Sequence, residues 1–241
     1  ATAPITSPVR SMGGLIGGEA AALSKLEAKT DSGTANACIA DPMLARATTY
    51  AMAVLETNAS MGRIVAAPTA GSSGVVPAML LAAQDEHGFS DEELIDALVN
   101  AAAIGYLITR NATVAGAEGG CQAEVGAASA MAASAACELF GGTPAQCFAA
   151  ASNALCGLMG LVCDPVAGLV EAPCQKRNAT GVANALVSAQ IASIGNLANF
   201  DETVEAMRRV GNSLPFELRE SALGGLAATP SACAFCEGCM N

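Results

Sequence analysis

The sequence has few aromatic residues and few charges. Of its 241 residues 3% are aromatic and 14% are charged, Trp is absent, and His87 is the only histidine. Eleven Lys and Arg stand against 22 Asp and Glu, which gives a formal net charge of −11. Nucleic acids and anionic membrane surfaces are bound through clustered basic side chains. We therefore expect neither a nucleic-acid nor a membrane partner.

Uninterrupted apolar runs of membrane-spanning length are also missing. The longest stretches without Asp, Glu, Lys or Arg are 64–84, 139–163 and 178–200. Each contains prolines, glycines or asparagines, whereas spanning helices are dominated by large apolar residues between basic and aromatic anchors. We expect buried helices instead. No signal peptide is recognisable, so we expect a cytoplasmic protein, and the first residue is Ala rather than Met, so we expect a preceding segment.

Helix signals dominate what is present, and strand alternation is confined to 63–66. Asp41-Pro42, Ser90 with Glu93, and Thr143-Pro144 are typical helix starts. We therefore predict an all-α fold, a compact single-domain multi-helix bundle in residues 1–230, followed by a cysteine-bearing tail in 231–241. The helices are predicted over 42–56, 91–109, 121–140, 144–158, 180–196 and 202–210, the last capped by Asp201.

Four junctions between these helices are rich in Gly, Ser, Thr, Asn and Pro. Such glycine-rich segments in an apolar helical body are where a ligand meets free backbone N–H groups. We therefore expect functional junctions at 11–18, 67–74, 111–120 and 163–178.

Ten cysteines are too few for a disulfide scaffold of this length, so thiols or metal ligands are expected. Cys121, Cys163 and Cys174 lie at the junctions, and three thiolates there could hold one metal centre. Cysteine is also a common small core residue. For the cysteines in helical, apolar context we predict inert packing. These are Cys38, Cys137, Cys147 and Cys156.

Four long motifs resemble those of one family, the iron–sulfur-dependent L-serine dehydratases (L-serine ammonia-lyases), in their alpha or catalytic module. The motifs occupy 66–74, 111–126, 160–179 and 218–227, in the order in which the family has them. The resemblance covers essentially the whole chain.

The resemblance implies that Cys121, Cys163 and Cys174 ligate a [4Fe-4S] cluster. Three thiolates on four irons leave one iron open as a Lewis acid. The implied reaction is the deamination of L-serine to pyruvate and ammonia, a step of amino-acid degradation that feeds gluconeogenesis.

The substrate carboxylate needs an anion site. Thr69, Ser72 and Ser73 supply hydroxyls and amides near an expected helix start, and the family motifs add Asn111 and Arg177. The same residue types cap helices and satisfy tight junctions, so the sequence leaves both readings open.

The general base is not identified by the sequence. Lys176 adjoins the cluster motif and is a candidate, although a lysine base needs a strongly lowered pKa. His87 lies in a charged connector and reads as a solvated loop residue. Family members also carry a beta module with a Ser/His motif, fused or separate, which this chain lacks. We therefore expect a beta subunit as partner in a homo- or hetero-oligomer.

The tail carries Cys233, Cys236 and Cys239. In single-chain relatives a C-terminal cysteine caps the open iron, and Cys233 is its counterpart by position. The two-residue spacing is equally compatible with an independent metal tail or with an end that carries oxidisable thiols.

Three alternatives stay open on the sequence. A pyridoxal phosphate enzyme would need a Schiff-base lysine, but Lys25, Lys29 and Lys176 lie in no recognisable motif for one. A cysteine desulfidase with the same cluster differs only in its leaving group. A catalytically silent partner subunit would use its cysteines around a structural metal such as zinc.

Overall fold

The protein is all-α. The computed structural model describes residues 9–28, 38–194 and 198–239, and this part contains ten α-helices and no strand apart from one isolated bridge between Cys163 and Arg219. The prediction of an all-α fold is therefore confirmed. The helices are α2 (Glu19–Glu27), α3 (Pro42–Ala59), α4 (Val75–His87), α5 (Asp91–Asn111), α6 (Gly116–Gly119), α7 (Ala127–Leu139), α8 (Pro144–Leu158), α9 (Cys174–Gln190), α10 (Phe200–Ser213) and α11 (Pro230–Cys239).

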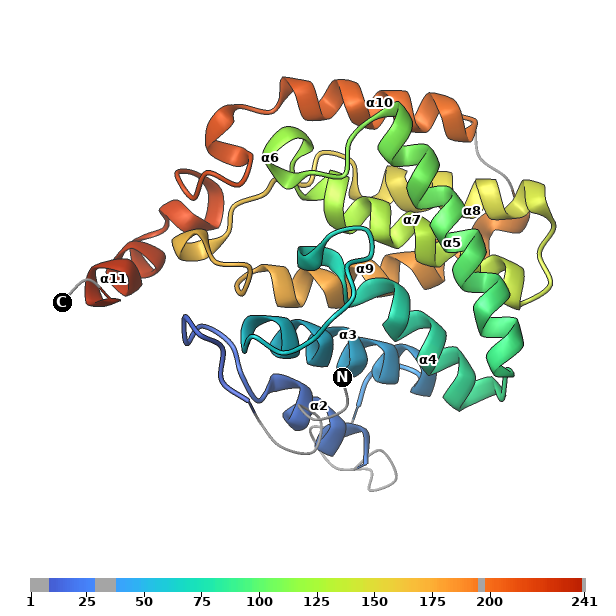
Figure 1. Cartoon of the computed structure of the whole chain (residues 1–241), viewed down its shortest axis with the longest axis horizontal. Helices are drawn as coiled ribbons and strands as arrows, with labels where there is room; N and C mark the ends of the chain where they lie inside the picture. The colour runs from blue at the N-terminus through green and yellow to red at the C-terminus, as the bar shows by residue number, and fades with distance from the viewer. Residues whose placement is uncertain (1–8, 29–37, 195–197, 240–241) are drawn as a thin grey trace.

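Helix α7 is the centre of the molecule, surrounded by α4, α5, α8 and α9 (Figure 1). Every residue from 127 to 137 is buried, and most of them are alanines. Small side chains let the neighbouring helices approach α7 from all sides, so the alanine content reflects close helix packing.

Local capping fixes three of the predicted helix starts. Asp41 accepts a hydrogen bond from the Leu44 N–H, and Ser90 and Thr143 form capping boxes with the residues three positions later. Because these signals lie within four residues of sequence, they can be read without tertiary information.

Other helix starts differ from the prediction. Helix α10 is capped by Asn199, whose side chain accepts from the Glu202 N–H, and not by Asp201, which lies inside the helix. Helix α9 begins at Cys174 rather than at residue 180. Helix α2 lies outside the predicted helices, and of α4 only a start near the 67–74 junction is predicted. Both helices follow a glycine, Gly18 or Gly74, without a side-chain cap.

The cysteines expected to pack in helices divide into two pairs. Cys137 and Cys147 are buried in the main core, which confirms the prediction for them. Cys156 is exposed although it lies in α8, and Cys38 is half-buried and precedes α3. The prediction is wrong for Cys156 because the apolar character of a stretch does not say which helix face turns inward, and for Cys38 because its segment is not helical and only half buries the side chain.

In the described part of the chain no helix is long and apolar enough to span a membrane. The last described helix is α11, which packs on the segments Val166–Gly168 and Gly225–Ala228. Cys236 and Cys239 lie in this helix, but their side chains fall outside the described residues. The division into a domain at 1–230 and a tail at 231–241 stays a prediction.

Candidate metal centre

One buried amide joins two of the glycine-rich junctions. Asn178, on α9, accepts from the Gly74 N–H at 3.0 Å and donates to the carbonyls of Gly71 at 2.7 Å and Cys174 at 2.9 Å. Asn178 is fully buried, so each of these bonds satisfies a group that water cannot reach. The 67–74 junction is thereby fixed to the turn that carries Cys174.

A second buried side chain fixes the N-terminal junction. The Glu171 carboxylate accepts from the Ser11 hydroxyl at 2.6 Å and from the N–H groups of Gly13 at 2.7 Å and Leu15 at 2.9 Å. Charge-assisted bonds of this length are strong. Segment 11–18 therefore lies against the loop between Cys163 and Cys174.

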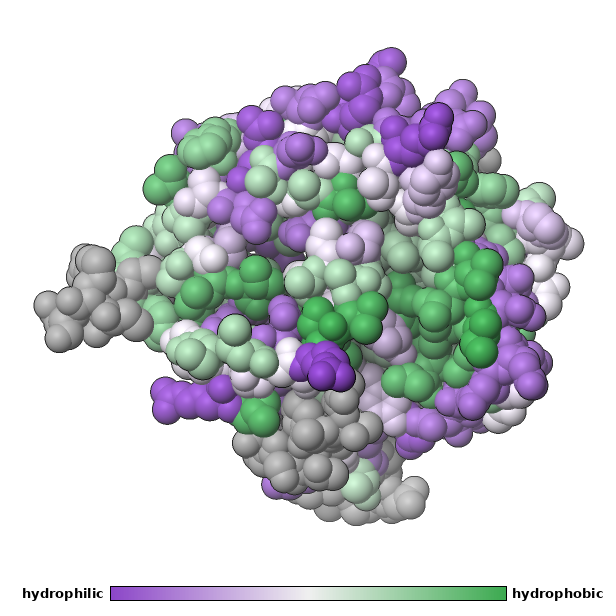
Figure 2. Space-filling model, in the orientation of Figure 1, coloured by the Kyte–Doolittle hydropathy of each residue, from purple (hydrophilic) through white to green (hydrophobic). Residues whose placement is uncertain are grey.

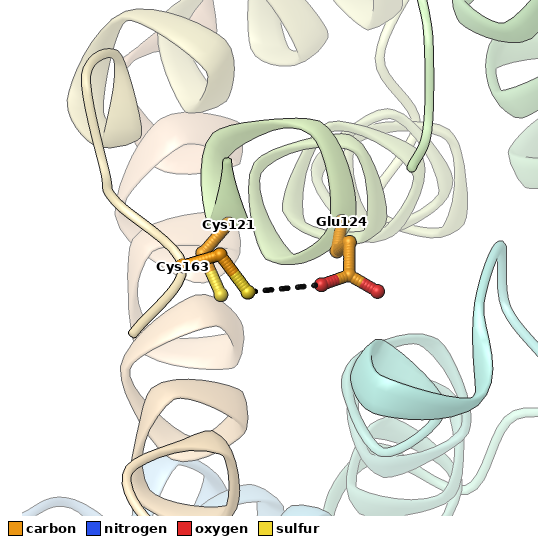
Figure 3. A group of neighbouring side chains, drawn as sticks. All are labelled: Cys121, Glu124 and Cys163. Carbon is orange, nitrogen blue, oxygen red and sulfur yellow. Dashed lines mark hydrogen bonds between the residues drawn. The ribbon is translucent and has the colours of Figure 1, made fainter. Parts of the chain in front are cut away.

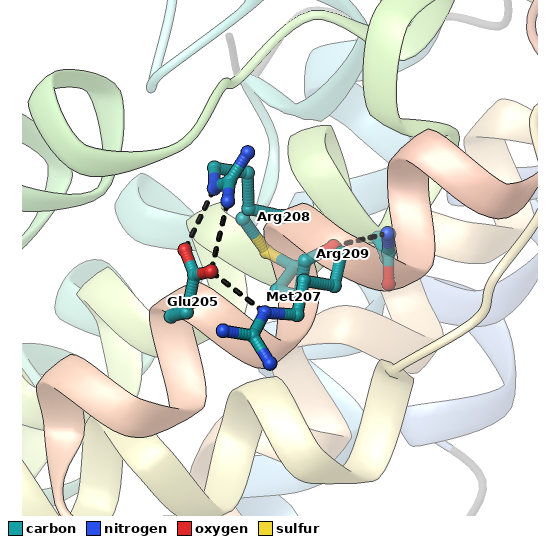
Figure 4. Close-up of polar contacts among 5 residues, drawn as sticks. Glu205, Met207, Arg208 and Arg209 are labelled. Atoms are coloured by element: carbon teal, nitrogen blue, oxygen red, sulfur yellow. Dashed lines mark hydrogen bonds and ion pairs between the residues drawn. The ribbon is translucent and has the colours of Figure 1, made fainter.

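Cys121 lies directly before a π-helical turn, Gln122–Gly126, which leads into α7. The buried Gln122 side chain accepts from the Gly160 N–H and donates to the Met207 carbonyl of α10, the helix drawn in Figure 4 with its Glu205 ion pairs to Arg208 and Arg209. Gly120 has a φ of 74°, and a Cβ there would lie 2.8 Å from the Leu161 carbonyl oxygen. The glycine thus lets the two chain segments that carry Cys121 and Cys163 come together.

Cys163 is held by the fourth motif. Its N–H donates to the Leu218 carbonyl, and its own carbonyl accepts from the Glu220 N–H, both at 2.8 Å. One residue further, the Asp164 carboxylate accepts from the Leu226 N–H at 2.7 Å. Segment 218–227 therefore backs the cysteine loop.

Two thiols and a carboxylate form a compact donor group (Figure 3). The ligand atoms of Cys121, Glu124 and Cys163 all lie within 4.8 Å of one another, and the Cys163 Sγ is 3.8 Å from Glu124 Oε2. The group could hold a metal ion. A Cβ on Gly116 would lie 2.5 Å from Glu124 Oε2 and 3.2 Å from the Cys163 Sγ, so the space beside these donors depends on a glycine.

Arg177 faces this group from α9. Its Nη1 lies 2.7 Å from Asp164 Oδ1, 2.9 Å from the Val162 carbonyl and 3.7 Å from the Cys121 Sγ. The pKa of Cys121 is lowered because the Cys163 thiol donates to its sulfur and because the guanidinium is positively charged. The same contact raises the pKa of Cys163, which keeps the shared proton. The pair therefore favours one thiolate, at Cys121.

Cys174 is buried at the start of α9, outside the 4.8 Å group. Burial, together with the negative charges of Cys121 and Glu124, raises the pKa of its thiol to about 12. A single ion needs all its thiolates on one atom, whereas a cluster places each thiolate on a different iron and so spreads the sulfurs further apart. Cys174 therefore lies outside the group of atoms that could share one ion.

Glu124 is the residue that sequence reasoning missed. It is half-buried, its Oε1 accepts from the Thr69 hydroxyl at 2.8 Å, and burial raises the pKa of its carboxyl group. Glu124 lies three residues after Cys121, one turn along the same helical segment. That spacing was the signal available in the sequence.

The predicted substrate residues have different surroundings. Thr69 is half-buried and faces Glu124, whereas Ser72 and Ser73 are fully buried and donate to the carbonyls of Ala67 and Ala70 within their own loop. Asn111 is exposed at the end of α5 and donates to the Leu107 carbonyl.

The remaining candidates lie on the surface. Lys176 is exposed on the first turn of α9, and Cys233 is exposed on α11 with its Sγ 3.9 Å from the Ala227 carbonyl. His87 is exposed at the end of α4, where it packs edge-on against Phe140.

Comparison with known proteins identifies the family of this chain. The family model described as serine dehydratase alpha chain matches residues 2–227. The chain belongs to the serine dehydratase alpha chain family. The "L-serine dehydratase, alpha chain" of Peptoniphilus asaccharolyticus is 53% identical over 193 residues, and the "Probable L-serine dehydratase, alpha chain" of Bacillus subtilis is 47% identical over 225 residues. The matched residues include Cys121, Cys163 and Cys174 but end before Cys233.

The relatives in this family differ in length. The matches cover 79% of this chain and 66% of the Peptoniphilus protein, and 92% of this chain and 73% of the Bacillus protein. The "L-serine dehydratase" of Streptomyces coelicolor is 41% identical over 190 residues, which are 77% of this chain but only 42% of that protein. The chain thus corresponds to one part of the longer family members.

Proposed function

We propose that this chain is the catalytic alpha component of an L-serine dehydratase, a lyase that deaminates L-serine to pyruvate and ammonia with the help of a [4Fe-4S] cluster. The observation that carries the proposal is the convergence of four family motifs on Cys121, Cys163 and Cys174, with Arg177 and Glu124 facing them.

The buried donor set fits such a cluster. All three thiols are at most 6% exposed, and soft thiolates are the ligands that iron–sulfur clusters take. When bound by three cysteines, a [4Fe-4S] cluster supplies a Lewis acid toward the substrate hydroxyl, since one iron has no protein thiolate. Arg177 is then a positioning residue, because its contacts stabilise the Cys121 thiolate and tie it to the Asp164 loop.

Under this proposal Glu124 and Thr69 form one edge of the substrate-binding site. An ionised Glu124 carboxylate beside the thiols binds the ammonium group of an amino acid, and the Thr69 hydroxyl fixes the orientation of that carboxylate at 2.8 Å. Ser72 and Ser73 stabilise the loop instead, because their hydroxyls donate to carbonyl groups of the loop itself.

The proton on the substrate Cα needs a base from elsewhere. Lys176 is exposed to solvent on the first turn of α9. We therefore assign the base, or the group that positions it, to a beta partner that completes the site. A general base must come within hydrogen-bond reach of the proton that it removes.

Anaerobic purification with single cysteine variants tests the proposal. The wild-type chain should be brown, contain iron and sulfide, and with its beta chain release pyruvate from L-serine. Cys121→Ser, Cys163→Ser and Cys174→Ser should each lose colour and activity, while Cys137→Ala, an equally buried thiol in α7, should keep both. A colourless wild-type protein filled with zinc would contradict the proposal.

A further inference from the structure

Helix α5 has two apolar sides, and only one of them is covered. Ala97, Ala101, Ile104 and Ile108 are buried, and the helix packs chiefly against α7. On the other side a helical stripe of large apolar residues is 49% to 65% exposed. Its members are Ile95, Leu98, Val99 and Tyr106. Large exposed apolar patches are uncommon on soluble monomers, and where they occur they usually mark a binding surface.

The stripe forms a ridge between an apolar groove and a hollow with a mixed polar and apolar lining. On the α4 side a groove of about 580 Å³ is lined by Leu80 and Leu81 of α4 and by Leu94 and Leu98 of α5. On the other side a hollow of about 500 Å³ is lined by Val99 and Phe148 among others. Figure 2 shows the resulting hydrophobic area over α4 and α5. We call the stripe on α5, together with the groove beside α4, the α5 face.

The charges around the α5 face select the kind of partner. Asp91, Glu92, Glu93 and Asp96 are exposed on the first two turns of α5, whereas Arg110, at the far end, is its single basic residue and donates to the Tyr106 hydroxyl at 3.2 Å. A second copy of this chain, with its net charge of −11, would bring more acidic than basic groups to this rim. A partner with Lys or Arg beside an apolar segment is complementary.

The α5 face is continuous with the candidate metal centre. The same groove is lined by Ala67 and Pro68, and Thr69, the next residue, donates to Glu124. A protein seated in the groove would therefore border the site at the loop that carries its substrate-binding edge.

We propose that the α5 face binds the beta chain of the dehydratase through an apolar segment flanked by Lys or Arg. This inference rests on the proposed function for the identity of the partner. The Streptomyces relative, of which this chain matches 42%, shows that family members contain a large additional part.

Binding of the purified beta chain to variants of the full-length chain tests the inference. Leu98→Glu should raise the Kd at least tenfold, because a charge replaces an apolar contact in the groove. Val187→Glu, on α9 and 60% exposed, is the matched control and should leave the Kd within about twofold. Asp91→Lys with Glu92→Lys should weaken binding and reduce its salt dependence.

Three results would overturn the inference. They are failure of the wild-type chain to bind the beta chain, equal affinity of Leu98→Glu and wild type, and a dimer of this chain alone that Leu98→Glu dissociates. Unchanged circular dichroism and thermal unfolding of Leu98→Glu would show that the variant is folded. Because the readout is binding, a complex that lacks serine activity would contradict the proposed function and leave the α5 face supported.

Discussion

At the residue scale, Glu124 is the side chain whose role the structure adds to the cysteine motif. It lies between the Thr69 hydroxyl and the Cys163 thiol, and it is the acidic member of the donor group (Figure 3). Under the proposed function its partner is the ammonium group of L-serine.

Glu124→Gln should therefore weaken the binding of L-serine without removing the cluster. Loss of a charged hydrogen bond of about 1.5–3 kcal/mol raises the KM roughly 10- to 150-fold. Inhibition by 3-hydroxypropanoate, which lacks the amino group, should be unchanged, and so should the visible absorption of the anaerobic protein. Equal weakening of both ligands would contradict the ammonium assignment.

Cys137 shows how burial decides thiol reactivity. Burial first, and then the neighbouring Cys147, raise the pKa of Cys137 to about 12, whereas the Cys233 side chain is exposed. The folded state therefore favours the neutral thiol, and the thiolate forms only as the pH rises through that value.

In the folded protein at pH 8, iodoacetamide should modify Cys233 rapidly and Cys137 very slowly. The Cys137 rate should rise about tenfold per pH unit between pH 8 and pH 10, because the thiolate fraction does so below the pKa. Mass spectrometry of the alkylated peptides measures both rates. Unfolding in denaturant should abolish the difference, and rapid labelling of folded Cys137 at pH 8 would refute this account.

At the element scale, the sequence predicts what local signals determine. The starts of α3, α5 and α8 are readable because each capping side chain lies next to the N–H that it satisfies. The start of α9 at Cys174 is not, because no side chain caps it and its position depends on long-range contacts, those of Asn178 with the 67–74 junction and of the Glu171 carboxylate with segment 11–18. Glu124 is likewise recognised only in the folded structure, through its contacts with Thr69 and Cys163, which are distant in sequence.

Gly116, in α6, tests whether the space beside the donors is required. Gly116→Ala places a Cβ 2.5 Å from Glu124 Oε2 and should lower the iron and sulfide content of the anaerobic protein by at least half. Gly126→Ala, in the π-helical turn, meets only ordinary contacts at 3.8 Å and 3.9 Å, and should retain the cluster. Equal iron content in the two variants would show that the space beside Gly116 is not part of the site.

At the scale of the whole molecule, the three predicted ligands join segments that are far apart in sequence. Cys121 precedes α7, Cys163 lies in the loop after α8, and Cys174 begins α9, while segments 11–18 and 218–227 rest on the same loop. A group that binds only the folded arrangement of these segments shifts the unfolding equilibrium of the entire domain toward the native state.

Cluster loading should therefore raise the Tm of the whole chain by about 5–15 °C, since each kcal/mol is worth about 2–4 °C in a protein of this size. Calorimetry under anaerobic conditions, before and after reconstitution with iron and sulfide, measures the shift. Cys137→Ala should show the same increment from a lower starting Tm, because its thiol belongs to the core and not to the donor set. Cys174→Ser should lose most of the increment, because α9 is then no longer tied to the other two ligands. If loaded and unloaded wild-type protein unfold at one temperature, the three cysteines do not act as a common centre, and the convergence of the four motifs has a purely structural cause.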